Sequence, residues 1–226
     1  MRGVIQDSPM AMDARLFAPA TRRNRDAILA VLERALPRSG FVLEVASGSG
    51  EHAVYFAARL PSLVFQPSDP DPAARASIDA WAATGRLSNV RRALALDAAA
   101  SDWPIERADA VLCINMIHIA PWRATEGLLA GSARVLGPGG ILYLYGPLRR
   151  GGGHTASSNA AFDAELRARN PEWGVRAVED VAALAAKAGF SEPEIVEMPA
   201  NNLSLVFRRL AAPRPERARI ATRDSG

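Results

Sequence analysis

A strand, a glycine turn and a helix are predicted in direct succession over residues 41–60, and this arrangement constrains the fold most. Residues 41–45 read Phe-Val-Leu-Glu-Val and predict a buried strand. Ala-Ser-Gly-Ser-Gly follows at 46–50, and residues 51–60 have the apolar spacing of a helix. Glycines let a backbone turn tightly and approach a ligand closely, and the first N–H groups of the helix then face that ligand. The stretch therefore predicts a ligand site at the end of a buried strand.

The remaining chain predicts alternating helices and strands. Apolar spacing and breaker residues indicate helices at 21–36, 73–83, 125–136, from Ser157 or Ser158 to 169, and at 179–188. Apolar runs predict strands at 63–66, 90–96, 109–115, 141–145, 194–198 and 203–208. Alternation of this kind gives an α/β fold with a mostly parallel sheet and helices on both faces. Only residues 199–202 join the last two strands, so these form an antiparallel hairpin.

Length and composition predict one domain over residues 14–210, with flexible termini at 1–13 and 211–226. The chain has 226 residues and a formal net charge of +3. Its C-terminal arginines are not interleaved with aromatic residues, so nucleic acid is not the expected partner. No apolar run has the length of a membrane span, and residues 1–13 lack a signal pattern. A single cysteine, Cys113, favours a cytoplasmic location. Oligomeric state is not predicted.

Two acidic residues follow predicted strands in the first half of the chain. Asp69 lies about 20 residues beyond the glycine turn, where nucleotide-binding βαβ units place a carboxylate that binds ribose. Asp71 is expected to cap the next helix instead. Asp97 follows the strand predicted at 90–96 and is positioned to accept a hydrogen bond from an adenine amino group.

The strand at 109–115 predicts a second group of site residues. Residues 115–118 read Asn-Met-Ile-His and fall at the carboxyl edge of the sheet, where open α/β sheets bind ligands. His118 is the best candidate for a general base because its unperturbed pKa is about 6.5. His154 and Tyr145 are the next candidates, although Tyr145 is also suited to stabilising positive charge through its ring or to packing. Residues 149–153 are basic and glycine-rich and predict a flexible lid.

Several longer phrases carry a family resemblance. They are Leu-Glu-Val-Ala-Ser-Gly-Ser-Gly-Glu-His at 43–52, Gln-Pro-Ser-Asp-Pro-Asp at 66–71, Ile-Asn-Met-Ile-His-Ile-Ala-Pro-Trp at 114–122, Leu-Tyr-Gly-Pro at 144–147, Ser-Asn-Ala-Ala-Phe-Asp at 158–163 and Met-Pro-Ala-Asn-Asn-Leu-Ser-Leu-Val-Phe at 198–207. From about residue 17 to 209 the chain resembles class I S-adenosylmethionine-dependent methyltransferases. Within that class it is similar to the methyltransferase-like protein 26 family, long catalogued as a domain of unknown function.

The resemblance implies a Rossmann-like, seven-stranded sheet, S-adenosylmethionine as cofactor and a small-molecule methyl acceptor. It implies a cofactor site in which the methionine and ribose end contacts Glu44, Ala46, Gly48 and Gly50, the ribose hydroxyls contact Asp69, the adenine contacts Asp97 and Ala98, and the methionine portion contacts Asn115. Arg23 and Asn24 are further candidates for contact with the cofactor carboxylate. Asn159, Asp163, Asn201 and Asn202 are candidates for orienting a polar acceptor.

Other functions remain open at this stage. Residues 48–53 read Gly-Ser-Gly-Glu-His-Ala and fit G-x-G-x-x-A, so an NAD-dependent oxidoreductase is the main alternative. A non-catalytic cofactor-binding protein of the same fold is another. A nucleic-acid methyltransferase is a third, but the Asn/Asp-Pro-Pro-aromatic signature is missing at 115–118.

Overall fold

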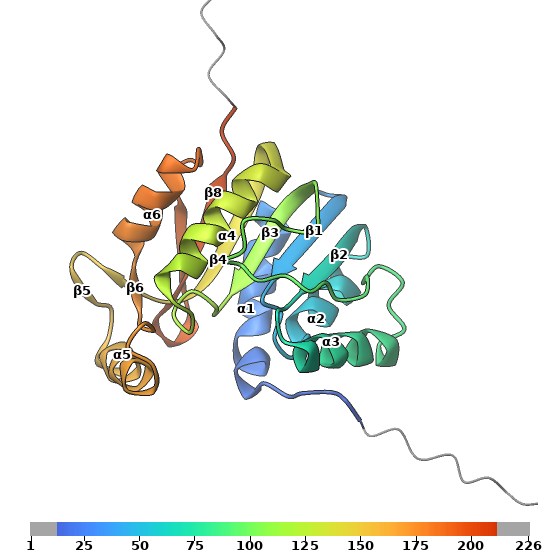
Figure 1. Ribbon diagram of the computed structural model, residues 1–226, viewed down its shortest axis with the longest axis horizontal. Coiled ribbons are helices and arrows are strands. Elements are labelled where there is room, and N and C mark those ends of the chain that lie inside the picture. Colours follow the sequence, from blue (N-terminus) through green and yellow to red (C-terminus); the bar gives the residue numbers. More distant parts are fainter. Residues whose placement is uncertain (1–12, 212–226) are drawn as a thin grey trace, which may run out of the picture.

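The computed structural model describes residues 13–211. Figure 1 shows a twisted sheet with helices on both faces. In chain order the elements are α1 (Pro19–Ala35), β1 (Gly40–Val45), α2 (Glu51–Arg59), β2 (Leu63–Ser68), α3 (Pro72–Thr84), β3 (Ala108–Ile114), α4 (Trp122–Val135), β4 (Leu136–Arg150), β5 (Gly153–His154), α5 (Ser157–Arg169), β6 (Arg176–Ala177), α6 (Val178–Lys187), β7 (Glu194–Met198), a 3₁₀ turn (Pro199–Asn201) and β8 (Asn202–Arg208). The predicted termini lie outside the described residues, except for Asp13 and Ala211.

The order of strands across the sheet is β2-β1-β3-β4-β8-β7, and short strands β5 and β6 also pair with β4. β1 runs parallel to β2 and β3, β3 runs parallel to β4, and β8 runs antiparallel to both β4 and β7. The mostly parallel α/β fold with a C-terminal antiparallel pair is therefore confirmed. After β1 the chain adds β2 on one side of it, and later adds β3 on the other side. This reversal makes the carboxyl ends of β1 and β3 the topological switch point, where open α/β sheets bind ligands.

The segment predicted as a strand at 90–96 is not a regular strand. It forms two isolated parallel bridges beside β2, Phe65 with Val90 and Ser68 with Leu94. Between them the side chain of Gln66 donates to the carbonyl oxygen of Arg92 at 2.7 Å, so a side chain replaces part of the backbone ladder. The segment still occupies the position of a seventh strand at this edge of the sheet.

The prediction of a flexible lid at 149–153 is wrong. The segment is a two-residue β-hairpin in which Arg150 pairs with Gly153 and Arg149 pairs with His154. Gly151 and Gly152 have φ values of 61° and 79°, the backbone that a tight hairpin turn requires. β4 continues to Arg150, five residues beyond its predicted end at residue 145. The segment predicted as a lid is therefore part of the sheet.

Two hydrophobic clusters lie on opposite faces of the sheet because side chains alternate along each strand. Leu43 of β1 belongs to the cluster with Leu128 of α4 and the apolar side of α6. Val42, its neighbour, belongs to the cluster with Ile28 of α1 and Phe56 of α2. Burial on both faces explains why the central strands are almost wholly apolar. No helix within residues 13–211 is long and apolar enough to cross a membrane.

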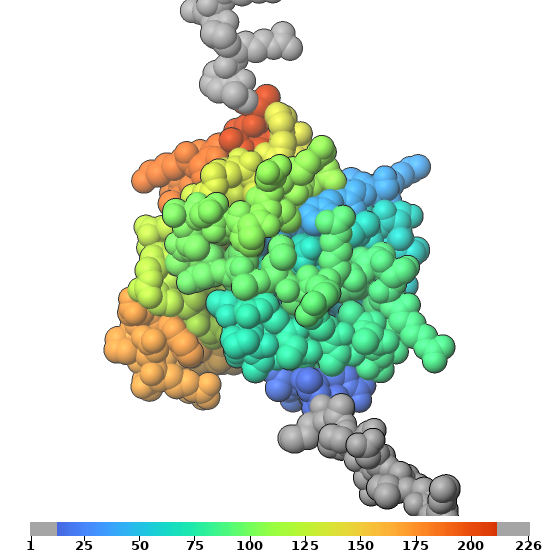
Figure 2. Space-filling model, turned by 45° about the vertical axis from the view of Figure 1, so that its right-hand side comes forward, coloured from blue at the N-terminus to red at the C-terminus, as the bar shows by residue number. Residues whose placement is uncertain are grey.

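The start of α1 is fixed by the segment that precedes it, which packs against α3 (Figure 2). The backbone N–H of Leu16 donates to the Ser77 hydroxyl at 2.7 Å, and Trp81 Nε1 donates to the Leu16 carbonyl at 2.9 Å. The Phe17 ring meets the Trp81 ring edge to face. The Glu51 carboxylate at the start of α2 also accepts the Ala18 N–H. Together these contacts hold the first turn of α1 near the carboxyl edge of the sheet.

Candidate functional site

The turn after β1 adopts a backbone that favours glycine. Ala46, Gly48 and Gly50 have φ values of 57°, 56° and 87°. A Cβ on Gly48 would meet no atom within 4 Å, so space is open beside the turn. A Cβ on Gly50 would lie 2.7 Å from the Cα of Ile78 in α3, so only glycine fits there. The two glycines therefore serve different purposes: Gly48 leaves room for a ligand, and Gly50 lets α2 and α3 approach.

Asp69 ties the end of β2 to this turn. Its carboxylate accepts hydrogen bonds from the backbone N–H of Gly48 and of Asp71, both at 3.0 Å. The side chain is buried, and burial raises the pKa of Asp69 while the two N–H donors act in the opposite direction. Asp71 accepts the N–H of Ala73 at 2.8 Å and caps α3, as predicted. The roughly 20-residue separation of Asp69 from the glycine turn in the sequence thus becomes a direct hydrogen bond between Asp69 and Gly48.

Glu44 is the most unusual group at the switch point. Its side chain is 2% exposed, and its Oε2 has no hydrogen-bond partner among residues 13–211. Burial raises the pKa of Glu44 to about 7. A buried carboxyl with an unpartnered oxygen is costly unless a ligand supplies the missing donor. A cationic ligand group, such as the ammonium of an amino acid, would supply it.

A cavity of about 420 Å³ opens at the same edge of the sheet. It is lined by residues of α1, α5 and the ends of β3, β4 and β8: Ala20, Arg23, Asn24, Asn115, His118, Tyr145, Pro147, Asn159, Phe162, Pro199, Ala200 and Asn202. Because β8 runs antiparallel to β4, Asn202 at its start pairs with Pro147 and reaches this edge. The fold therefore brings together several predicted residues from distant parts of the chain. Asn115 has a φ of 63°, a backbone that is uncommon outside glycine and often found at functional sites.

His118 lies in the wall of this cavity as a neutral imidazole. It is 3% exposed, and its Nδ1 has no hydrogen-bond partner among the described residues. Burial, together with a smaller effect of the nearby Arg176 charge, lowers the pKa of His118 to about 4. The Arg176 guanidinium donates to the carbonyl oxygens of Ile117 and Ala120 and so fixes the loop that carries the histidine. The Phe162 ring of α5 meets the imidazole edge to face, with centroids 5.7 Å apart.

His52 and Asn24 form a buried pair that connects α2 with α1, and sequence reasoning missed His52. The Nε2 of His52 lies 2.8 Å from Oδ1 of Asn24. Burial lowers the pKa of His52 to about 4, so the neutral ring donates and the Asn24 amide group is oriented by it. Asn24 in turn hydrogen-bonds to Tyr145, whose pKa is raised by burial. The position of His52, two residues after Gly50, was the only signal for this contact.

Other predicted residues lie elsewhere. His154 lies 3.6 Å from the carboxylate of Asp163, which also accepts the N–H of Val175 and the Nε of Arg167, so this cluster ties α5 to the chain that follows it. Neither His154 nor Asp163 lines the cavity. Asn201 has a φ of 57°, and its carbonyl oxygen accepts the Asn159 side-chain N–H at 2.9 Å.

The residues predicted to meet adenine lie where the chain crosses from β2 toward β3. Asp97 is exposed, and its carboxylate accepts the N–H of Ala99 at 2.9 Å. Ala98 is buried, and its carbonyl oxygen lies close to Gly127 of α4. The Asp97 carboxylate therefore stabilises its own turn and remains accessible to solvent.

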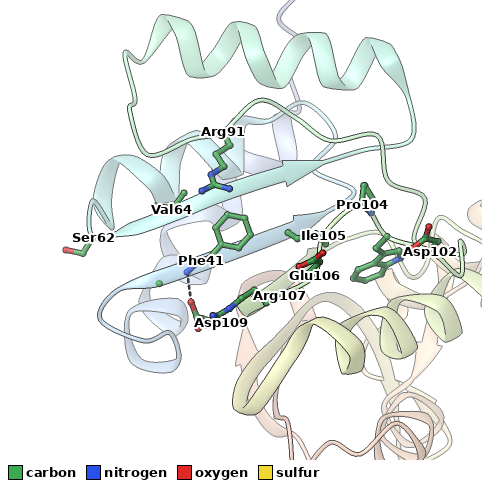
Figure 3. A pocket seen from close by; sticks show the side chains of 12 residues that line it. Phe41, Ser62, Val64, Arg91, Asp102, Pro104, Ile105, Glu106, Arg107 and Asp109 are labelled. Atoms are coloured by element: carbon green, nitrogen blue, oxygen red, sulfur yellow. Dashed lines mark hydrogen bonds between the residues drawn. The ribbon is translucent and has the colours of Figure 1, made fainter.

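A larger hollow, of about 990 Å³, lies at the opposite edge of the sheet (Figure 3). It is lined by the amino ends of β1, β2 and β3 and by the segment 102–107. Asp109 there accepts the N–H of Phe41 at 2.7 Å, and the Arg91 guanidinium lies over the Phe41 ring, whereas the buried indole Nε1 of Trp103 has no hydrogen-bond partner among residues 13–211. Within residues 13–211, no group of three or more His, Cys, Asp or Glu side chains is arranged to hold a metal ion.

A family model described as a protein of unknown function, DUF938, matches residues 15–209. The chain belongs to the DUF938 family. The match covers the whole of the sheet and all of the helices, so both the glycine turn and the cavity lie within the family domain.

The fold of this DUF938 chain is shared with solved S-adenosylmethionine-dependent methyltransferases. An O-methyltransferase family protein from Burkholderia thailandensis matches with a TM-score of 0.73 and 18% identity, over 86% of this chain and 57% of its own. An O-methyltransferase family 2 protein from Planctomyces limnophilus in complex with apigenin matches with a TM-score of 0.73 and 18% identity, over 84% of this chain and 58% of its own. Human N-acetylserotonin methyltransferase in complex with S-adenosylmethionine matches with a TM-score of 0.69 and 15% identity, over 85% of this chain and 53% of its own. This chain thus spans a little over half the length of each of these structures.

Proposed function

We propose that this protein transfers a methyl group from S-adenosylmethionine to a small-molecule acceptor through an N, O or S nucleophile. The observation that carries the proposal is the buried, unpartnered carboxyl of Glu44 beside the glycine turn, at the switch point of a methyltransferase fold. The sequence phrases further support kinship with the methyltransferase-like protein 26 family. We also propose that the enzyme acts in the cytoplasm.

The residues present fit this cofactor. Glu44 would accept from the ammonium of its methionine portion, and Gly48 has open space where the ligand would approach. Asp69, already held by the Gly48 N–H, would accept from the ribose hydroxyls. Asn115 would border the methionine portion, and Asp97 and Ala98 would meet the adenine. Ala46 and Gly50 would shape the turn, and Asn24 would contact the carboxylate end.

When bound, the cofactor supplies an electrophilic methyl group on a sulfonium, which leaves the protein the tasks of orientation, water exclusion and proton transfer. His118 would take the proton from an acceptor that arrives protonated, since the imidazole is neutral and lines the cavity. Tyr145 of β4 and Asn159 of α5, which both line the cavity, would orient the acceptor. His154, Asp163 and Asn201 would act indirectly, by holding α5 and the turn before β8.

Calorimetric titration of the full chain with S-adenosylmethionine and with NAD tests the cofactor. We expect binding of the first and not of the second, because Glu44 needs a cationic partner that NAD does not offer near the glycine turn. NAD binding alone would favour the oxidoreductase. Labelled cofactor incubated with a metabolite extract, followed by a product-mass search, tests transfer; cofactor binding without any labelled product would favour a non-catalytic protein.

A further inference from the structure

We propose that the methyl acceptor is an aromatic carboxylate, with its carboxylate held by Arg23 at the start of α1 and its nucleophile presented to His118. The inference rests on the proposed function and concerns the class of acceptor only.

The charges that line the cavity exclude a cationic acceptor. Arg23 is the one formally charged side chain among the described lining residues, and none of them is aspartate, glutamate or lysine. Arg23 forms no ion pair within 4.0 Å among residues 13–211. An ammonium bound here would lie near the exposed guanidinium of Arg23 with no carboxylate among the described lining residues to pair with it, and like charges repel. A carboxylate would instead pair with the guanidinium through two hydrogen bonds.

The first turn of α1 adds to the attraction for an anion. Ala20, Arg23 and Asn24 all line the cavity and lie in the first two turns of the helix. The helix has no acidic residue in its first turn and no side-chain cap, although an acid is the favoured neighbour of a helix N-terminus. The Glu51 carboxylate accepts the N–H of the N-cap residue Ala18 and the Ser49 hydroxyl, so one acid already lies at the helix start and the attraction for an anion rests chiefly on Arg23.

The other walls suit an aromatic ring that carries a hydroxyl or similar nucleophile. Phe162, Tyr145 and Pro147 provide apolar surface, and Phe162 already meets the His118 ring edge to face. His118 is buried, its imidazole is neutral, and its Nδ1 has no hydrogen-bond partner among residues 13–211. A neutral imidazole can accept a proton from a hydroxyl, whereas an amine that is protonated at neutral pH would bring its own charge to a site with no carboxylate.

A matched series of probes tests the inference on the full chain saturated with S-adenosylhomocysteine. The probes are 4-hydroxybenzoate, 4-hydroxybenzamide and 4-hydroxybenzylamine, and their dissociation constants are measured by ligand-observed NMR titration. We expect the carboxylate to bind at least about tenfold tighter than the neutral amide, the loss expected for a charge-assisted pair. We expect no binding of the amine.

Substitutions of Arg23 separate this role from a role in cofactor binding. R23Q should reduce the affinity for 4-hydroxybenzoate to that of the amide, and R23E should reverse the preference in favour of the amine. R22Q, at an exposed arginine of α1 outside the cavity lining, is the matched control and should keep the wild-type order.

Four results would overturn the inference: equal or tighter binding of the amine by the wild type, binding of none of the probes, an unchanged carboxylate preference in R23Q, or a loss in R23Q of affinity for S-adenosylhomocysteine alone. The last result would assign Arg23 to the cofactor carboxylate. Failure of the wild type to bind S-adenosylhomocysteine would refute the proposed function itself, and is therefore distinguishable from these outcomes.

Discussion

The hollows at the two edges of the sheet differ in a way that size does not reveal. The hollow at the amino edge (Figure 3) is the larger, about 990 Å³ against about 420 Å³, and the buried atom that lacks a hydrogen-bond partner there among residues 13–211 is the Trp103 indole Nε1, which does not titrate. At the carboxyl edge, two titratable side chains, Glu44 and His118, are buried with atoms that have no hydrogen-bond partner in the described part of the chain. Unsatisfied buried groups cost stability and persist where a ligand supplies the missing partner. The carboxyl edge is thus distinguished by buried titratable groups without partners, and not by its volume.

The largest effect expected at the carboxyl edge is on methyl transfer itself. Replacing His118 by alanine should lower the rate of label transfer to the acceptor by about 10²- to 10⁴-fold, the usual contribution of a general base. Binding of S-adenosylmethionine should be unchanged, which calorimetry would verify. Unchanged turnover would remove the base role from His118 and weaken the contrast between the two edges.

The buried carboxyl of Glu44 predicts a pH dependence of folding. Burial raises the pKa of Glu44 from 4.5 to about 7, so its stabilising contribution is complete below pH 4.5 and is lost as the pH rises through 7. The resulting loss is on the order of 3 kcal/mol. Glu44→Gln should therefore gain stability relative to wild type as the pH is raised from 5 to 8 in urea unfolding of the cofactor-free protein.

The two buried histidines act in the opposite direction in the acidic range. Burial lowers the pKa of His52 and of His118 to about 4, so their contribution is present above pH 6.5 and lost as the pH falls through 4. The wild type and Glu44→Gln both retain these histidines. The difference between their free energies of unfolding therefore reports on Glu44 alone. A difference that does not change with pH would show that folding does not raise the pKa of Glu44.

Asp69 offers a sharper comparison within the carboxyl edge. Asp69→Ala should weaken binding of S-adenosylmethionine by about 10- to 100-fold, because hydrogen bonds to a charged carboxylate contribute about 1.5–3 kcal/mol. Asp71→Ala is the matched control: it removes the cap of α3 and should cost about 1 kcal/mol of stability without changing the affinity. Equal effects of the two substitutions on affinity would mean that Asp69 acts only through the shape of the turn.

The smallest effect is expected at the amino edge. Arg91→Gln removes a guanidinium that lies 4.7 Å from the centroid of the Phe41 ring, at an exposed position. We expect a loss of about 0.5–1 kcal/mol in the free energy of unfolding and less than about a twofold change in affinity for S-adenosylmethionine. A larger change in affinity would place a ligand in this hollow and contradict the comparison.

The sequence predicted those parts of the fold that neighbouring residues determine. The glycine turn, the cap at Asp71 and the apolar strand that ends at Asn115 are local signals, and each lies where the pattern placed it. It failed where a contact between distant segments decides the outcome. Pro67 of β2 has no N–H to donate to the strand predicted at 90–96, where the Gln66 side chain bonds the Arg92 carbonyl instead, and the continuation of β4 turns the predicted lid into a hairpin.

Site residues follow the same division. Asn115 and His118 were predicted from their position after a strand, which the sheet topology fixes. His154 and Asp163 have suitable chemistry for a site, but they pair with each other, which no spacing reveals. His52 was missed because its partner, Asn24, is 28 residues away on another helix.

The antiparallel direction of β8 has a consequence for the order in which the site is assembled. Asn202 reaches the cavity only because β8 pairs with β4 from Pro147 to Ile141, and those pairs join residues about 55 to 67 positions apart. Contacts so distant in sequence are costly in loop-closure entropy and form late. A chain still emerging from the ribosome therefore completes its glycine turn long before it can close the cavity, because the cavity depends on β8, the C-terminal strand of residues 13–211.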